Sequence, residues 1–117
     1  MGAGLIPGPF GGKAHAQGPA PAYFAEVPDL PLPPGFTSWA DGAAVFEAGA
    51  LRIVEVMAWG PMSGQPEEFY ARTLPALGWG EISRNVWHRD GEVLRLTLAR
   101  GAAGGPLWIK LRVGPPE

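Results

Sequence analysis

Side-chain catalysis needs a nucleophile, a base and an orienting acid in contact, and this chain has few residues for those roles. It contains two histidines and no cysteine. His88 is expected on a strand, with Ser83 five residues before it and Asp90 in the turn that follows. A Ser-His-Asp site needs hydrogen bonds between successive members, which this spacing does not supply. We therefore expect His88 to be a half-exposed strand residue. We also expect that the chain has no catalytic residue and is not an enzyme.

Metal and cofactor sites are equally poorly supported. A zinc or iron centre needs three or four converging ligands, whereas His15 and His88 are far apart in the chain. Gly11-Gly12-Lys13 resembles the end of a phosphate-binding loop, but Pro7 and Ala14 stand where that motif needs Gly and Ser or Thr. We expect neither a metal nor a cofactor.

Three carboxylates could support acid–base chemistry. Glu67 and Glu68 are adjacent, so on a helix they diverge by about 100°, and a position beside the positive end of the helix dipole explains both. Glu55 lies in an otherwise apolar alternating face of a strand, and a buried carboxylate there would need a partner. We expect a structural ion pair, with Arg95 or Arg84 as the candidate partner.

A set of cations and one aromatic residue gives the strongest binding signal. We expect them to share one sheet face, away from the helix, and an aromatic among cations suits a protein partner, a small anion or single-stranded nucleic acid. A solvated outer face is the structural alternative. The candidate binding residues are Arg52, Arg95, Trp108, Lys110 and Arg112.

The tryptophans are numerous for a chain of 117 residues. There are five, spread evenly along the sequence, which indicates core packing; two or three exposed ones would instead mark an interface. They are Trp39, Trp59, Trp79, Trp87 and Trp108.

Charge and hydropathy exclude two further classes. The net charge is −2, so the basic balance of a duplex-nucleic-acid-binding domain is absent. No apolar run approaches the ~20 residues that span a bilayer, and we expect no transmembrane segment.

Glycine and proline divide the chain. Residues 1–36 hold 15 of the 32 glycines and prolines but only three charges. We expect residues 1–26 to be a flexible leader or the remnant of a signal segment, residues 27–36 a Pro-rich extended lead-in, and residues 37–117 a single domain. Ala14-His15-Ala16 before Gln17 resembles a signal-peptidase site, although no basic residue lies near Met1. Export to the periplasm or medium is therefore expected, with the cytoplasm as the alternative.

The lead-in is stiff, because each proline fixes its own φ and extends the residue before it. We expect it to lay Val27, Leu30, Leu32 and Phe36 on the surface of the domain. The alternative is a polyproline peptide that docks in an aromatic groove of a partner.

The domain has a recognisable order of elements. Strands are predicted over residues 43–47, 51–59, 82–88, 93–100 and 107–113, with the 51–59 strand central. Pro66 opens a helix that Gly78 ends, and Pro75 should kink or tighten its last turn. Asp90-Gly91 predicts a type I′ hairpin that pairs Trp87 with Leu94. The order ββαβββ predicts an α+β two-layer sandwich, an antiparallel sheet of about five strands with one helix on one face.

Two segments carry a resemblance. Residues 69–79, reading FYARTLPALGW, and residues 89–94, reading RDGEVL, resemble a family of small, uncharacterised and mostly exported bacterial proteins with a Pro-rich entry and a terminal hairpin sheet. The likeness covers roughly residues 27–113. It implies the fold and implies no activity.

The function expected from these observations is non-enzymatic binding of another protein, in an exported accessory module. The first alternative is a small-ligand or anion-binding domain that uses the open sheet face. An enzyme of unknown class is the second alternative.

Overall fold

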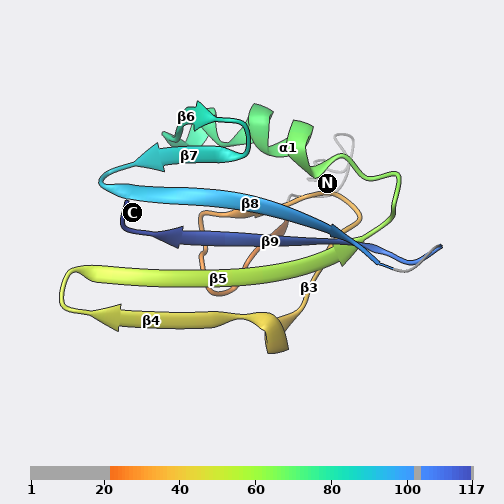
Figure 1. The fold of residues 1–117 in the computed structure, drawn as a ribbon, viewed down its shortest axis with the longest axis horizontal. Helices are drawn as coiled ribbons and strands as arrows, with labels where there is room; N and C mark the ends of the chain where they lie inside the picture. Colours follow the sequence, from red (N-terminus) through yellow and green to blue (C-terminus); the bar gives the residue numbers. More distant parts are fainter. Residues whose placement is uncertain (1–21, 102–103, 117) are drawn as a thin grey trace, which may run out of the picture.

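The computed structural model describes residues 22–101 and 104–116, which form a wide antiparallel sheet with one layer packed on it (Figure 1). The sheet has seven strands in the order β3-β5-β9-β8-β7-β6, and β4 also pairs with β5. This confirms the α+β fold, with more strands than the five expected. The strands are β3 (Thr37–Ser38), β4 (Ala44–Ala48), β5 (Leu51–Gly60), β6 (Gly80–Ser83), β7 (Val86–Arg89), β8 (Glu92–Arg100) and β9 (Leu107–Gly114).

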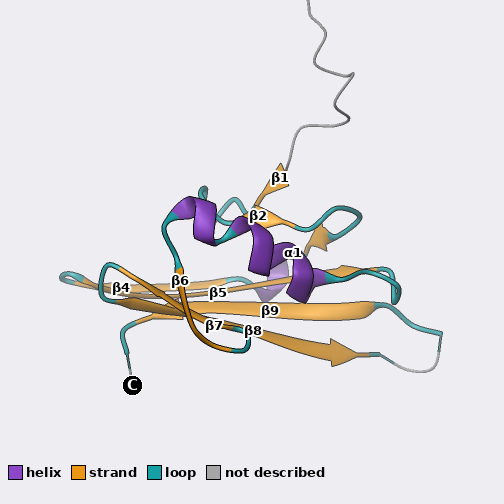
Figure 2. Cartoon of the chain, turned by 90° about the horizontal axis from the view of Figure 1, so that it is seen from above, coloured by secondary structure: helices purple, strands orange, loops and turns teal. Residues whose placement is uncertain are grey.

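One face of the sheet is covered and the other is open. Figure 2 shows the helix α1 (Pro66–Thr73) and the ribbon of β1 (Ala22–Tyr23) and β2 (Pro31–Leu32) on the same side of the sheet, with no described element on the opposite side. We call these sides the covered face and the open face. Alternation along β5, β8 and β9 assigns to the open face Ile53, Glu55, Met57, Trp59, Val93, Arg95, Thr97, Ala99, Trp108, Lys110 and Arg112.

The covered face is apolar because the strand periodicity of two brings every second residue beneath the helix. Leu111 lies between Val56 of β5 and Leu96 of β8 in the register, and all three are buried. Tyr70 of α1 and Leu74 just after it reach this layer, both with no exposed surface, while Phe69 and Leu77 pack against its edge. The apolar side of the helix thus faces the sheet.

The helix ends as its sequence predicts. Pro75 cannot donate a helical hydrogen bond, and the chain tightens into a 3-10 turn over Pro75–Leu77. Gly78 then takes a φ of 94°, the left-handed geometry that glycine adopts without steric cost.

Two tight turns set the register of the strands from β6 to β8. Asp90 and Gly91 both have positive φ, 51° and 79°, which confirms the type I′ turn and its pairing of Trp87 with Leu94. The single strand expected over residues 82–88 is wrong. Asn85 has a φ of 65° and turns the chain between β6 and β7, where the register also shifts.

The Pro-rich segment before residue 37 is part of the core. Phe24, Val27, Leu30 and Phe36 are all buried in the same cluster as the sheet. The physical reason is the width of the sheet, since one helix covers only part of a face this broad. Phe24 belongs to the stretch expected as a flexible leader, yet its side chain is buried. Residues 1–21, with Ala14-His15-Ala16, lie outside the described residues.

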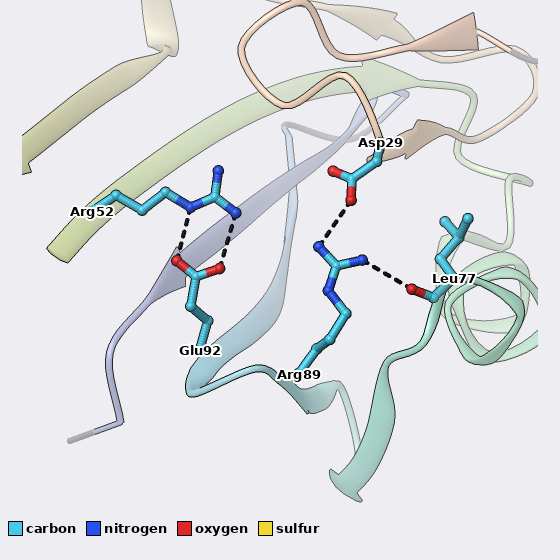
Figure 3. Close-up of polar contacts among 5 residues, drawn as sticks. All are labelled: Asp29, Arg52, Leu77, Arg89 and Glu92. Atoms are coloured by element: carbon cyan, nitrogen blue, oxygen red, sulfur yellow. Dashed lines mark hydrogen bonds and ion pairs between the residues drawn. The ribbon is translucent and has the colours of Figure 1, made fainter. Parts of the chain in front are cut away.

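Arg89 joins the two halves of the covering layer. Its guanidinium donates to the Leu77 carbonyl oxygen at 2.9 Å and to the Asp29 carboxylate at 2.8 Å (Figure 3). It also stacks 4.4 Å from the ring centre of Trp79. One side chain of β7 therefore holds the helix end and the Pro-rich segment against the sheet.

Candidate functional site

Three tryptophans gather at one end of the open face. Trp59 and Trp108 are direct partners on β5 and β9, and Trp39 meets Trp108 edge-to-face with ring centres 5.4 Å apart. Trp39 and Trp59 keep 42% and 41% of their surface exposed, whereas Trp79 and Trp87 are buried in the core. The expectation that the tryptophans mainly pack the core therefore holds for two of the five. We call Trp39, Trp59 and Trp108 the tryptophan cluster.

Local structure explains how Trp39 reaches this cluster. Its backbone N–H donates to the Met57 carbonyl oxygen at 2.9 Å, which continues the β3–β5 ladder by one residue. A 3-10 turn over Ala40–Gly42 follows at once. A side chain added at Gly42 would meet the Trp39 ring at 2.6 Å and the Met57 sulfur at 2.8 Å, so the turn packs directly against both residues.

A shallow hollow of about 260 Å³ opens beside the tryptophan cluster. Its wall comes from β5, β8 and β9, where Ala99 and Thr97 are too small to fill the space between Trp108 and Lys110. Met57 closes the β5 side of the hollow. The hollow thus combines an aromatic wall, a flexible thioether and a cation at its rim.

A row of charges crosses the middle of the open face next to this hollow. Arg112 lies between Arg95 of β8 and Glu55 of β5 in the sheet register. Its Nε atom is 3.5 Å from the Glu55 carboxylate, and Lys110 is exposed one alternation away. Among the open-face residues defined above, three cations stand against one carboxylate, so this surface is locally basic in a chain of net charge −2.

The ion pair expected for Glu55 exists, but its partner is one that the sequence reasoning did not consider. Glu55 and Arg112 are direct cross-strand neighbours. Arg84, one of the two candidates, lies instead 3.4 Å from Glu67. Glu55 is half-buried and therefore has a structural role within the charge row.

Arg52 is not part of the open face, so the expectation that it shares one sheet face with Arg95, Trp108, Lys110 and Arg112 is wrong. It shares the alternation of Val54 and so points to the covered side, at the end of the sheet. There its guanidinium donates two hydrogen bonds to Glu92, at 2.8 and 2.9 Å (Figure 3). The hydrogen bonds to Glu92 raise the pKa of Arg52 above its ordinary value. Arg52 is thus a structural clamp between β5 and β8.

The residues weighed for catalysis do not form a site. His88 is exposed on β7 opposite Gly80, and Ser83 is at the irregular end of β6. Within residues 22–101 and 104–116, no group of three His, Asp or Glu could hold a metal ion.

Glu67 has a role that its place in the first helical turn did not reveal. Its carboxylate accepts a hydrogen bond from the Asn85 side chain at 2.7 Å. That bond and the nearby Arg84 lower the pKa of Glu67. Glu67 thereby ties α1 to the β6–β7 turn.

The sequence contained a signal for the residues that were missed on the open face. Met57 and Trp59 alternate with Glu55 along β5 and therefore lie on the same face of the sheet. Pairing β5 with β9 would have placed both beside Trp108. Trp39 had no such signal, because it follows a two-residue strand.

The chain was compared with family models, curated proteins and solved structures, and none of them matches it. The resemblance to a family of small exported bacterial proteins therefore stays a prediction. No helix among the described residues is long and apolar enough to cross a membrane.

Proposed function

We propose that this protein is a non-enzymatic binding module whose open face docks an acidic segment of another protein. The observation that carries the proposal is the tryptophan cluster next to the cation row. Both groups lie on one face of a regular sheet that no described element covers.

The aromatic part of this surface favours contact with another protein over exposure to solvent. Scattered apolar residues are normal on a protein surface, whereas a contiguous apolar patch rimmed by polar groups is typical of an interaction site. Trp39, Trp59 and Trp108 are contiguous, and Lys110 is at their rim. Tryptophan and arginine are also the side chains that contribute most to interface energetics.

The charged part indicates the chemistry of the partner. Arg95, Lys110 and Arg112 exceed the single carboxylate of Glu55 among the open-face residues. Electrostatic complementarity then favours a partner that carries Asp or Glu. An apolar or proline side chain of the same segment would enter the hollow beside Trp108.

The shape of the hollow supports a macromolecular partner over a small ligand. At about 260 Å³ it is below the roughly 300–1,000 Å³ of small-molecule sites. Its floor is a flat sheet, so a ligand would remain largely exposed. A peptide segment can instead extend along the whole face.

Site-specific photocrosslinking tests the proposal. A photoreactive residue at Thr97, exposed in the centre of the open face, should form adducts with an acidic, tryptophan- or proline-containing peptide. The matched control is the same residue at Ala76, which is exposed on the covering layer. Thr97 adducts should disappear in the double variant Trp59→Ala, Lys110→Glu.

Three results would contradict the proposal. Equal adduct yields at Thr97 and Ala76 would mean that binding is not located on the open face. Adducts that survive in a folded double variant would mean that the tryptophan and the cation are not used. Stabilisation of the free protein by small anions alone, lost with raised salt, would favour the anion-binding alternative.

The proposal also places the protein in the periplasm or the medium. The sequence pattern around Ala16 and Gln17 supports this location. Mass spectrometry of the protein from its native cell should find Gln17 as the mature N-terminus in the exported fraction. Chain that retains Met1 and stays in the cytoplasmic fraction would refute export.

A further inference from the structure

The outer edge of the strand β4 is paired with no other strand in the part of the chain that the structure describes. The strand pairs with β5 on one side, over five consecutive residue pairs without a register shift. Its sequence AVFEA contains no proline and no lysine, and all five residues are exposed. Natural sheets usually blunt such an edge with proline, with charged side chains, especially lysine, or with a bulge, and β4 has a single charged residue, Glu47. The opposite edge, β6, does carry a bulge.

Both faces of β4 present uncovered apolar side chains. Phe46 pairs with Ile53 and so lies on the open face, with 62% of its surface exposed. Val45 pairs with Val54 and lies on the covered side, yet 54% of its surface is exposed because the helix layer does not extend this far.

The hairpin that joins β4 to β5 shows which backbone groups of β4 are free. Gly49 has a φ of 63° at the first position of a two-residue turn, the geometry of a type II′ turn. The pair that closes such a turn, Ala48 and Leu51, is a hydrogen-bonded pair, and bonded and non-bonded pairs alternate from there. The N–H and C=O groups of Val45 and Glu47 must therefore point outward.

A printed hydrogen bond supports this phase independently. By the same alternation, the odd-numbered residues of β5 direct their backbone groups toward the β4 edge. Met57 does so, because its carbonyl oxygen accepts the bond from Trp39, on the same edge of β5.

From these observations we propose that β4 pairs antiparallel with β4 of a second copy of this chain, with Phe46 on the two-fold axis. Val45 then exchanges two backbone hydrogen bonds with Glu47 of the partner subunit. Glu47 exchanges two with Val45 of the partner subunit. In each copy, the outward-pointing N–H and C=O groups of Val45 and Glu47 then all have a hydrogen-bond partner.

Self-pairing is favoured by the sequence of the strand. Phe46 faces Phe46 of the partner subunit as a non-hydrogen-bonded pair, the kind in which side chains approach most closely, and aromatic cross-strand pairs are stabilising. Ala44 faces Ala48 of the partner subunit. Glu47 faces an apolar residue, so no like charges are directly opposed, and in its own chain it lies opposite Arg52.

The dimer is expected to be weak and concentration-dependent. A five-residue strand gives a contact smaller than the roughly 1,600 Å² of a standard interface. Directly opposed residues point to the same face of a sheet. The two open faces would therefore lie side by side on one continuous sheet.

Sedimentation velocity of the full chain tests the dimer. Between about 10 μM and about 1 mM, the weight-average mass should rise from 12.3 kDa toward twice that value. Val45→Pro should abolish the rise, because it removes an outward N–H and leaves the β4–β5 ladder intact. Phe46→Lys should abolish it independently, should the proline variant fail to fold. Ile82→Lys, the same kind of change at an exposed residue of the opposite edge, is the control and should keep it.

Amide hydrogen exchange gives a residue-level readout of the same pairing. On dilution from the dimeric to the monomeric range, the amides of Val45 and Glu47 should lose protection while that of Phe46 keeps it.

A chain that stays monomeric at about 1 mM would overturn the proposal. So would association that Trp59→Ala abolishes and Phe46→Lys does not, since the open face would then be the contact. Protection of Val45 and Glu47 that is independent of concentration would show that the edge is covered in another way.

Discussion

The substitution Tyr70→Phe should show how strongly the helix and the Pro-rich segment are coupled. The Tyr70 ring has no exposed surface, and its hydroxyl donates to the Pro31 carbonyl oxygen at 2.7 Å. Phenylalanine fills almost the same volume. The change therefore removes one hydrogen bond between two elements of the covering layer and leaves the packing in place.

The expected loss of stability comes from the Pro31 carbonyl group, which would be left without its hydrogen-bond donor. Pro31 is buried, so its carbonyl oxygen would lose this bond without gaining access to water. Loss of a buried hydrogen bond that leaves one partner in place costs about 2 kcal/mol. In a domain of this size, that corresponds to a fall in Tm of roughly 8–16 °C.

At alkaline pH the wild type should lose its advantage in stability over Tyr70→Phe. Burial raises the pKa of the Tyr70 hydroxyl far above the ordinary value for tyrosine. Above about pH 10 the unfolded chain therefore releases a proton that the folded protein keeps. The stability of the wild type then falls by up to about 1.4 kcal/mol per pH unit. Tyr70→Phe lacks this loss, so the two stabilities should become equal near roughly pH 11.5.

Urea unfolding from pH 7 to pH 12, followed by tryptophan fluorescence, measures both quantities. The two proteins differ only in the Tyr70 hydroxyl, so the contributions of all other ionisable groups cancel in the difference. Tyr23→Phe is the matched control, because Tyr23 is half-exposed and should behave as the wild type. A cost below about 0.5 kcal/mol at neutral pH, with an unchanged alkaline slope, would refute a bonded and buried Tyr70.

Three further substitutions test other contacts of the fold. Arg89→Lys should cost roughly 1–3 kcal/mol in urea unfolding, because lysine cannot both stack on Trp79 and bridge two elements; a neutral result would contradict the bridge. Gly60→Ala should lower Tm by several degrees, since the new Cβ would lie 2.6 Å from the Phe36 ring, and an unchanged Tm would show that this ring can move. Gly91→Val should destabilise the protein by about 1–2 kcal/mol through the positive φ of this position alone, because no atom lies within 4 Å of the added Cβ. Amide hydrogen exchange in β7 and β8 should become faster, and unchanged exchange would argue against the turn.

Much of the sheet and the helix follows from local sequence rules. The alternation in β5 and β9 assigns Val56 and Leu111 to one face without reference to any partner. The Asp90-Gly91 pair sets the β7–β8 register on its own. Such features are predictable because a turn and a period of two are properties of neighbouring residues.

Other features depend on contacts between distant segments, and these the sequence did not reveal. The burial of Phe24 depends on a sheet wider than its helix, a property that emerges only when all strands are paired. The bond from Asn85 to Glu67 joins residues 18 positions apart. The tryptophan cluster likewise requires Trp39 to be carried beside Trp108 by the β3–β5 ladder.

The placement of β9 has a consequence for biosynthesis. This strand follows both β5 and β8 in the sequence, yet it lies between them and is their shared neighbour. Until it emerges from the ribosome, β5 and β8 each keep an unpaired inner edge, and the two halves of the sheet have no ladder between them. The complete sheet therefore cannot form until β9 has been synthesised, and a chain that ends after Arg100 should yield two open half-sheets that aggregate rather than a smaller folded protein.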